Sequence, residues 1–308
     1  MTGQEAGQQE ANSRVQALIA AVGTVLMGKE DQVRLALAGL LAGGHLLLED
    51  LPGTGKTTLA EALARSFGLA FKRVSFTSDL LPADLTGFNV LEPSTNTFHF
   101  QPGPLFSQVL LADEINRASP RTQSALLEAM AVGRVSVDGT SHPLPEPFVV
   151  IATQNGLDQI GTAPLPESQL DRFLMRLSLG FPDRAAERAL LKGEGLGLDS
   201  FLLGLAPADL PALRRRSQQQ HCSGALLDYV LDLVTASRRP DQPGATGVPR
   251  ASQGLLAAAR AWSLLEGRGY VTPSDVQAVF AAVAEHRLDP ASQGGLSERL
   301  LESVDAIR

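Results

Sequence analysis

The residues of this chain best suited to chemistry lie in a glycine-rich stretch, Pro52-Gly53-Thr54-Gly55-Lys56-Thr57-Thr58. An apolar run, Leu46-Leu47-Leu48, precedes it, and apolar residues at helical spacing follow it. A strand, a glycine-rich turn and a helix in this order form a phosphate-binding loop, in which backbone N–H groups and the positive end of the helix dipole stabilise a polyphosphate. The stretch therefore predicts nucleotide binding. Asp50 stands where the strict pattern has its first glycine, and we expect its side chain to point away from the phosphates.

Two acids at the end of a second apolar run would complete such a site. Val109-Leu110-Leu111-Ala112 leads directly into Asp113 and Glu114. Because open α/β sheets bind ligands at the carboxyl ends of their strands, Asp113 is predicted to hold Mg²⁺ through water, together with the Thr57 hydroxyl. Glu114 is predicted to activate the attacking water as general base, and Lys56 to contact the β- and γ-phosphates. The alternative, a pair of solvated acids in a loop, is weakened by the phosphate loop upstream.

Further strands must bring these residues together. Residues 71–76, 148–152 and 173–179 are predicted strands, and continuous apolar runs of this kind indicate burial on both faces, as in a parallel sheet. The run at 148–152 ends in Thr153-Gln154-Asn155, whose polar groups would hydrogen-bond the attacking water or the γ-phosphate. We therefore predict an α/β nucleotide-binding core with a parallel five-stranded sheet.

Two β-hairpins are predicted outside this sheet. Residues 87–91 and 97–100 are β-prone and flank a turn-forming segment. In the second hairpin, residues 135–137 and 141–144 flank the turn signal Asp138-Gly139. Phe98, His99 and Phe100 would be either core contacts or a functional loop surface, and the sequence leaves both readings open.

The secondary-structure pattern divides the chain. Residues 1–13 are polar and are expected to be a flexible N-terminus, and residues 14–182 to form the core, beginning with helices at about 14–26 and 31–42. After Pro182 helical patterns dominate, so we expect a linker at 183–200 and a small all-α lid domain at 201–308. The segment Val25 to Gly28 is either a wall for the adenine base or an ordinary turn between helices.

The composition narrows the class of protein. With 308 residues the chain exceeds the usual size of one core, so we expect two domains. Its content of 44% hydrophobic residues is too high for a disordered protein. The net charge of −7 argues against nucleic-acid binding, and Arg214-Arg215-Arg216 is expected to be a solvated face. No apolar stretch is long enough to span a membrane, and one cysteine, Cys222, fits a reducing compartment, so we expect a cytoplasmic protein. The histidines lie far apart, and none is assigned to a metal.

Several longer stretches closely resemble the MoxR family of AAA+ ATPases. They are 78–87 (SDLLPADLTG), 110–118 (LLADEINRA), 122–130 (TQSALLEAM), 151–155 (IATQN) and 165–173 (LPESQLDRF), and the likeness runs from about residue 14 to 290. The resemblance implies an AAA+ core that hydrolyses ATP with Mg²⁺ and carries a helical lid. The hairpin near 86–100 looks like the insertion in the second core helix that marks this branch, and the one near 135–144 like the insertion before the sensor strand.

The same resemblance implies roles for individual residues. Lys56 and Thr57 would belong to Walker A, Asp113 and Glu114 to Walker B, Asn155 to sensor 1 and Arg250 to sensor 2 on the lid. Arg172 looks like the arginine finger, which stabilises developing charge in a neighbouring subunit's site. The alternative for Arg172 is a salt bridge to Asp171 or Glu167. The resemblance further implies a homo-oligomeric ring, expected to be a hexamer, a client protein remodelled in a chaperone-like way and association with a von Willebrand factor A-domain protein.

Two other functional classes compete with this reading. A nucleotide-dependent scaffold would bind ATP and assemble with little hydrolysis, but it would have no need of a base at Glu114. A chelatase-like or DNA-directed motor subunit would use a related module, although the acidic balance makes the DNA-directed form the weaker of the two. A GTPase is disfavoured because the chain contains no Asn-Lys-x-Asp motif for reading guanine.

Overall fold

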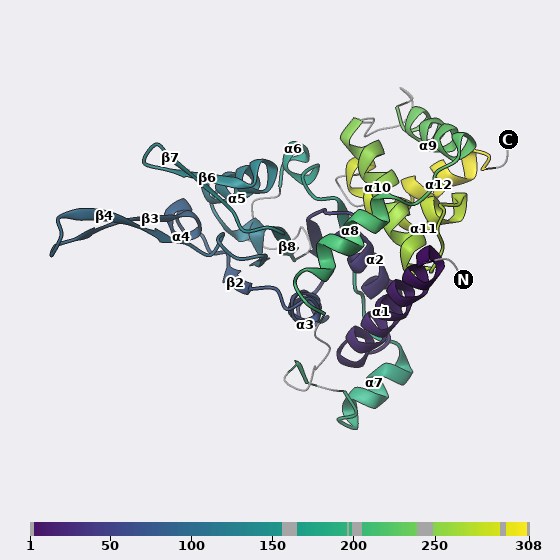
Figure 1. Cartoon of the computed structure of the whole chain (residues 1–308), viewed down its shortest axis with the longest axis horizontal. Coiled ribbons are helices and arrows are strands. Elements are labelled where there is room, and N and C mark those ends of the chain that lie inside the picture. Colours follow the sequence, from purple (N-terminus) through teal and green to yellow (C-terminus); the bar gives the residue numbers. More distant parts are fainter. Residues whose placement is uncertain are drawn as a thin grey trace.

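The centre of the molecule is a parallel sheet (Figure 1). The computed structural model describes residues 3–155, 165–195, 197–198, 205–238, 249–289 and 294–306, with the backbone alone at residues 3–12, 249 and 250. Five strands pair in the order β2-β5-β8-β1-β9, and every neighbouring pair is parallel. Their bounds are β1 Leu46–Glu49, β2 Phe71–Ser75, β5 Val109–Asp113, β8 Val149–Gln154 and β9 Met175–Leu177. The predicted five-stranded parallel sheet is confirmed.

The apolar runs divide their side chains between the two faces of the sheet. Leu46 and Leu48 belong to one hydrophobic cluster, whereas Leu47 belongs to the other, because successive side chains of a strand point to opposite faces. The first cluster includes apolar residues of α1 (Gly3–Val25), α2 (Glu30–Leu41) and α3 (Lys56–Ser66), and the second includes residues of α5 (Pro120–Val132). Helices on both faces therefore bury the sheet and fix the positions of its strand ends.

Both predicted hairpins are present and project from the same side of the core (Figure 1). They are β3 (Gly87–Glu92) with β4 (Thr97–Pro102), and β6 (Arg134–Val137) with β7 (Thr140–Pro143). Asn89 Nδ2 donates to Asp138 Oδ2 at 2.7 Å, which joins the two hairpins. The structure decides between the readings of the aromatic residues: Phe98 is 70% exposed, whereas the Phe100 ring stacks on His142 with 3.9 Å between the ring centroids.

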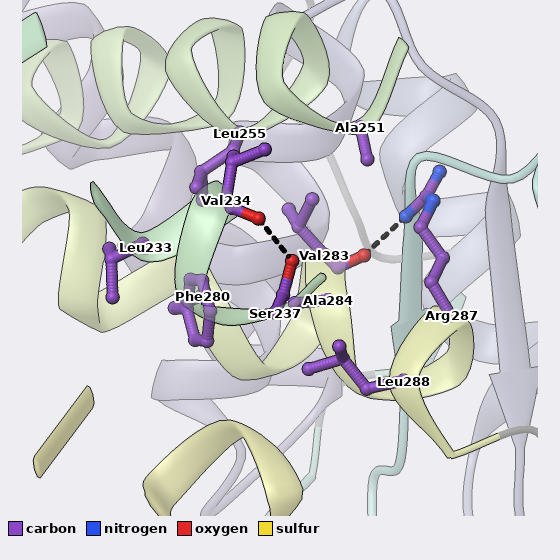
Figure 2. Close-up of a pocket in the computed structure, with 10 residues that line it drawn as sticks. All are labelled: Leu233, Val234, Ser237, Ala251, Leu255, Phe280, Val283, Ala284, Arg287 and Leu288. Atoms are coloured by element: carbon purple, nitrogen blue, oxygen red, sulfur yellow. Dashed lines mark hydrogen bonds between the residues drawn. The ribbon is translucent and has the colours of Figure 1, made fainter. Parts of the chain in front are cut away.

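The C-terminal region is helical, as predicted. Its helices are α8 (Asp209–Gln218), α9 (Gly224–Ala236), α10 (Pro249–Leu265), α11 (Pro273–Leu288) and α12 (Leu296–Ser303). Figure 2 shows apolar side chains from α9, α10 and α11 facing one another around a small pocket in this lid. Lid residues and residues of α1 and α2 belong to one hydrophobic cluster, so the lid packs directly on the core.

The structure differs from the sequence-based expectations at three places. Helix α1 begins at Gly3, inside the segment 1–13 expected to be flexible. Helix α7 (Arg184–Leu191) lies within the expected linker 183–200, where the Asp183 side chain caps it by accepting from the Ala186 amide at 2.7 Å. The prediction of a solvated face was wrong for Arg214, whose half-buried guanidinium donates to the Leu40 carbonyl at the end of α2 at 3.0 Å.

The remaining short helices are α4 (Pro82–Thr86), α6 (Glu167–Leu170) and the single-turn η1 (Ile115–Arg117). Within the described ranges, no helix combines the length and the apolar character that crossing a bilayer would need.

Candidate active site

The phosphate loop connects the end of β1 to the start of α3. Its two glycines have backbone conformations that L-residues rarely adopt, with φ of +85° at Gly53 and +95° at Gly55. Gly55 is also the N-cap of α3, so the tight turn delivers the chain directly into the helix at Lys56. The amide groups of the first helical turn have no partner within the helix, and the positive end of the helix dipole lies at the same point. The loop is therefore suited to a phosphate group.

The Lys56 side chain lies within this loop and bonds its backbone. Its ammonium is buried and donates to the carbonyls of Asp50 at 2.7 Å and Leu51 at 2.8 Å. Burial lowers the pKa of the Lys56 ammonium, while the negative charges of Asp50, Asp113 and Glu114 oppose that shift. The amine is thus held at the centre of the loop.

The Asp50 carboxylate turns away from the loop, which confirms the prediction made for it. Its Oδ2 accepts from the amides of Leu179 at 2.5 Å and Gly180 at 2.7 Å, and from the Ser178 hydroxyl at 3.2 Å. Lys29 binds the same segment from another side, because its ammonium donates to the Leu179 carbonyl at 2.6 Å. Asp50 therefore anchors the chain beyond β9, and its charge acts on the phosphate loop through the Lys56 ammonium.

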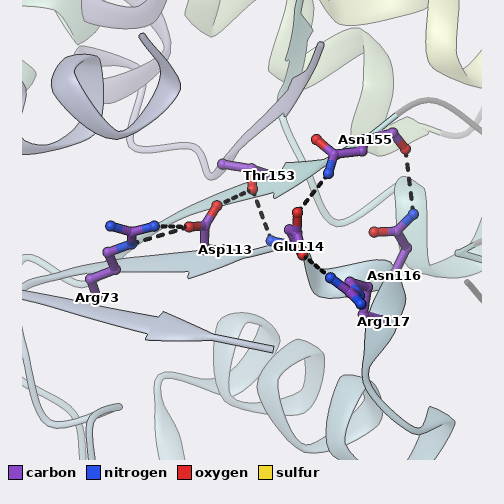
Figure 3. Close-up of polar contacts among 7 residues, drawn as sticks. All are labelled: Arg73, Asp113, Glu114, Asn116, Arg117, Thr153 and Asn155. Atoms are coloured by element: carbon purple, nitrogen blue, oxygen red, sulfur yellow. Dashed lines mark hydrogen bonds and ion pairs between the residues drawn. The ribbon is translucent and has the colours of Figure 1, made fainter. Parts of the chain in front are cut away.

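Asp113, at the end of β5, is fixed from two neighbouring strands (Figure 3). Its Oδ1 accepts from the Thr153 hydroxyl on β8 at 2.7 Å. Its Oδ2 accepts from Arg73 on β2, with 3.1 Å between Nε and Oδ2 and a second bond from Nη2. The carboxylate is therefore oriented before any ligand binds.

Glu114 follows in a strained conformation. With φ +58° and ψ +49° it occupies the left-handed region, which is costly for a residue with a Cβ atom. The Thr153 hydroxyl accepts from the Glu114 amide at 2.9 Å and so stabilises this conformation. The carboxylate accepts from Asn155 Nδ2 at 2.6 Å and from Arg117 Nη1 at 2.8 Å. The strained turn directs the Glu114 carboxylate toward Asn155 rather than along the strand (Figure 3).

These groups meet around one cavity of about 370 Å³. Ten residues line it: Pro52, Gly53, Gly55, Lys56, Thr57, Thr58, Arg73, Asp113, Glu114 and Asn155. Thr54 belongs to the loop but not to this lining, and its hydroxyl donates to the Leu51 carbonyl at 3.1 Å. Segments far apart in the sequence thus converge as predicted, with Arg73 as an addition.

The donor set fits a magnesium ion that is bound mainly by its ligand. The cavity offers the Thr57 hydroxyl and the Asp113 carboxylate, which are hard oxygen donors of the kind that Mg²⁺ prefers. Nowhere in the described ranges do three or more His, Cys, Asp or Glu side chains gather so that they could hold a metal ion by themselves. Magnesium at this place would depend on phosphate oxygens and water for the rest of its shell.

Two predicted site residues are not placed at the cavity by the described part of the structure. Arg172 follows α6 and is half-exposed, and Asp171, one alternative partner named for it, pairs with Arg287 at 2.9 Å instead. Arg250 lies in the first turn of α10, but its side chain is outside the described part of the chain.

The sequence reasoning missed Arg73, expected other partners for Thr153 than Asp113 and Glu114, and left the role of the segment Val25 to Gly28 open. Arg73 gave one weak signal, a charged residue within a predicted strand, and Thr153 was noted only as part of a polar strand end. The segment Val25 to Gly28 lies beside the phosphate loop, since a Cβ atom placed on Gly55 would be 3.9 Å from Leu26 Cγ.

Comparisons with known proteins find relatives along most of the chain. A family model described as "ATPase family associated with various cellular activities (AAA)" matches residues 45–175, and one described as "AAA lid domain" matches residues 244–304. The chain is 41% identical over 273 residues to "Chaperone MoxR1" of Mycobacterium tuberculosis, covering 86% of this chain and 72% of the relative. It is 36% identical over 295 residues to "Protein MoxR" of Paracoccus denitrificans, covering 87% and 86%. A crystal structure of a protein from Cytophaga hutchinsonii aligns with a TM-score of 0.87 and 32% identity over 99% of this chain and 98% of that chain.

Proposed function

The chain belongs to the MoxR family of AAA+ ATPases, and from this premise we propose that it hydrolyses ATP with Mg²⁺ in order to remodel or activate a protein partner. One observation carries the proposal: Lys56, Asp113, Glu114 and Asn155, which come from separate parts of the chain, line a single cavity at the phosphate loop. One relative is named a chaperone, and for this chain a chaperone-like function is our inference.

Each side chain has a role that its contacts support. Lys56 would leave the loop carbonyls to bind the β- and γ-phosphates, and the amides around Gly53 and Gly55 would hold the phosphate chain. Thr57 and Asp113 would hold magnesium, which supplies neutralisation of the charge that develops on the transferred phosphoryl group. Glu114 would take a proton from the attacking water, and Asn155, already bonded to Glu114, would keep that carboxylate in place. Leu26, beside the phosphate loop, would form part of the adenine wall.

Arg172 suggests that the active unit is an oligomer. It lies outside the cavity of its own chain on a partly buried turn, so as an arginine finger it would serve a neighbouring subunit. We propose a ring, a hexamer by family resemblance, in which Arg250 acts from the lid on the nucleotide of its own subunit. A von Willebrand factor A-domain protein is the proposed partner, also by family resemblance.

Steady-state phosphate release tests the enzymatic assignment. Wild-type protein should release phosphate from ATP only with Mg²⁺ present, and Lys56→Ala should abolish turnover because the phosphates lose their ammonium. Glu114→Gln should retain ATP binding and lose hydrolysis, so a pull-down with this variant should retain the client. Unchanged turnover in Lys56→Ala would refute the proposal.

A nucleotide-dependent scaffold with little hydrolysis remains the second candidate. One observation favours it: Asn155 and Arg117 both donate to the Glu114 carboxylate, and donors on a carboxylate stabilise its charged form and make it a weaker base. If the wild type binds ATP tightly and releases no phosphate with or without a partner, the scaffold is the better description.

A further inference from the structure

Arg287, near the end of lid helix α11, directs four of its five N–H donors at the core and one at the Val283 carbonyl of its own helix. All five N–H donors of an arginine are engaged here. Nε donates to Asp171 Oδ1 at 2.9 Å, Nη1 to the carbonyls of Leu174 at 3.3 Å and Val283, and Nη2 to the carbonyls of Asp171 at 3.2 Å and Phe173 at 2.8 Å. The Arg287 side chain is only 7% exposed. Figure 2 shows the guanidinium pointing out of the apolar lid pocket.

The acceptors on the core are the backbone on both sides of Arg172. Asp171 precedes it and Phe173 follows it, so the carbonyls bonded by Arg287 Nη2 belong to its two chain neighbours. His286, next to Arg287 on α11, adds a bond from Nε2 to the Phe173 carbonyl at 3.3 Å. Phe173 itself is fully buried. One end of a lid helix therefore fixes the turn from which Arg172 projects.

The chemistry of this contact requires an arginine. A guanidinium presents its donors in a rigid planar fork, whereas a lysine ammonium is a point charge with three donors on a flexible stem. Lysine at this position would keep the charge opposite Asp171 but would lose the simultaneous bonds to both neighbours of Arg172. Because trans stabilisation of a transition state depends on placing a cation within a fraction of an ångström, the turn needs such a support.

We infer that Arg287 is a positioning residue for Arg172. Through Arg287, the lid of each subunit fixes the position of Arg172, the arginine finger that this subunit contributes to its neighbour's site. This inference rests on the proposed ATPase function. In our proposal the lid carries Arg250, which acts on the nucleotide of its own subunit. By this inference the same lid also positions Arg172, which acts on the nucleotide of the neighbouring subunit. Arg287 does not line the phosphate-loop cavity of its own chain.

Mixed assemblies separate action on the neighbour's site from action on the subunit's own site. Two variants with different tags are co-expressed, purified over both tags and assayed for phosphate release. Lys56→Ala has no active site of its own but an intact finger, and Arg172→Ala has an intact site but no finger. Their mixture should regain activity, and failure of this pair would count against the trans finger of the proposed function, not against the role of Arg287.

Arg287→Lys alone should lower kcat by about 10- to 100-fold with KM for ATP nearly unchanged, as for a misplaced catalytic group. It should regain activity when mixed with Lys56→Ala, which supplies an intact finger, and should not regain it when mixed with Arg172→Ala. The reverse pattern would show that Arg287 serves its own site, and it would overturn the inference. Recovery in neither mixture or in both, or wild-type turnover in Arg287→Lys alone, would also overturn it.

A matched lid variant controls for loss of stability. Arg268 forms an ion pair with buried Asp275 inside the lid, and none of its contacts in the described ranges is to a predicted site residue. Arg268→Gln leaves the buried Asp275 carboxylate without this partner and should weaken the lid, but it does not touch the turn of Arg172. At a temperature where both variants are folded, its turnover should therefore stay within about twofold of wild type. If Arg268→Gln lost activity like Arg287→Lys, the effect would be general weakening of the lid, and the inference would be wrong.

Discussion

Arg73 on β2 and Asp113 at the end of the neighbouring strand β5 form a two-bond ion pair inside the candidate active site. The two side chains differ in their surroundings: 51% of the Arg73 side chain is exposed, against 15% of the Asp113 side chain. The guanidinium occupies one oxygen of the carboxylate that we assign to magnesium. In the proposed function, this cation of the protein would therefore compete with the metal for the same carboxylate.

This competition gives a measurable magnesium dependence. Arg73→Gln should lower the Mg²⁺ concentration for half-maximal phosphate release by about two- to fivefold, the range expected for a half-exposed ion pair of up to about 1 kcal/mol. Titration of Mg²⁺ at saturating ATP measures the shift. Lys72→Gln, its exposed neighbour on the same strand, is the control and should cause no shift. A higher magnesium requirement in Arg73→Gln would show that Arg73 assists the metal or the phosphates.

We expect Thr153 to contribute to both stability and turnover, although the family motifs assign it no individual role. Thr153→Val removes the hydroxyl that bonds both the Asp113 carboxylate and the Glu114 amide. We expect a loss of about 1–3 kcal/mol in the free energy of unfolding, because a partly buried amide loses its acceptor. We also expect kcat to fall by about 10- to 100-fold as Glu114 moves. Denaturant unfolding and phosphate release measure the two effects. Thr153→Ser keeps the hydroxyl and should remain near wild type; equal damage in both variants would contradict this role.

The backbone of Gly55 sets a limit on substitution in the phosphate loop. At φ +95°, Gly55→Ala should lower the free energy of unfolding by about 1–2 kcal/mol and weaken ATP binding. The obstacle is conformational, since the nearest atom to an added Cβ is Leu26 Cγ at an ordinary 3.9 Å. Isothermal titration with a non-hydrolysable ATP analogue and thermal unfolding measure the effects. Gly23→Ala, within α1 and with open space around it, should be neutral or stabilising by about 0.5–1 kcal/mol.

Because of His45, the free energy of unfolding should fall in mild acid. Burial lowers the pKa of His45 from 6.5 to about 4, and its Nδ1 accepts from the Val150 amide at 3.0 Å. Since the unfolded chain binds a proton there below about pH 6.5 and the folded chain only near pH 4, stability falls as the pH drops through this window, by at most about 3 kcal/mol. His45→Asn retains an acceptor and should show a shallower decline in Tm between pH 7 and 4.5. His99→Asn, on the exposed hairpin, should follow the wild type.

The sequence by itself determined the nucleotide-binding fold, because its signals are local. Gly53 and Gly55 permit backbone angles that other residues resist, and apolar runs ending in Asp113 or in Thr153-Gln154-Asn155 identify buried parallel strands with polar carboxyl ends. Since all such ends lie at one edge of a parallel sheet, the meeting of Lys56, Asp113, Glu114 and Asn155 could be predicted before the strand order was known.

Only the tertiary structure decided which charged side chains meet. Arg73 and Asp113 are 40 residues apart, and Arg287 and Asp171 are 116 apart, so neither pair has a signature in local sequence. Arg214 looked like one of three solvated arginines until the packing of α8 placed it at the end of α2. A long cationic side chain samples many positions in the unfolded chain, and its partner is chosen by the packing of the elements that carry the two groups.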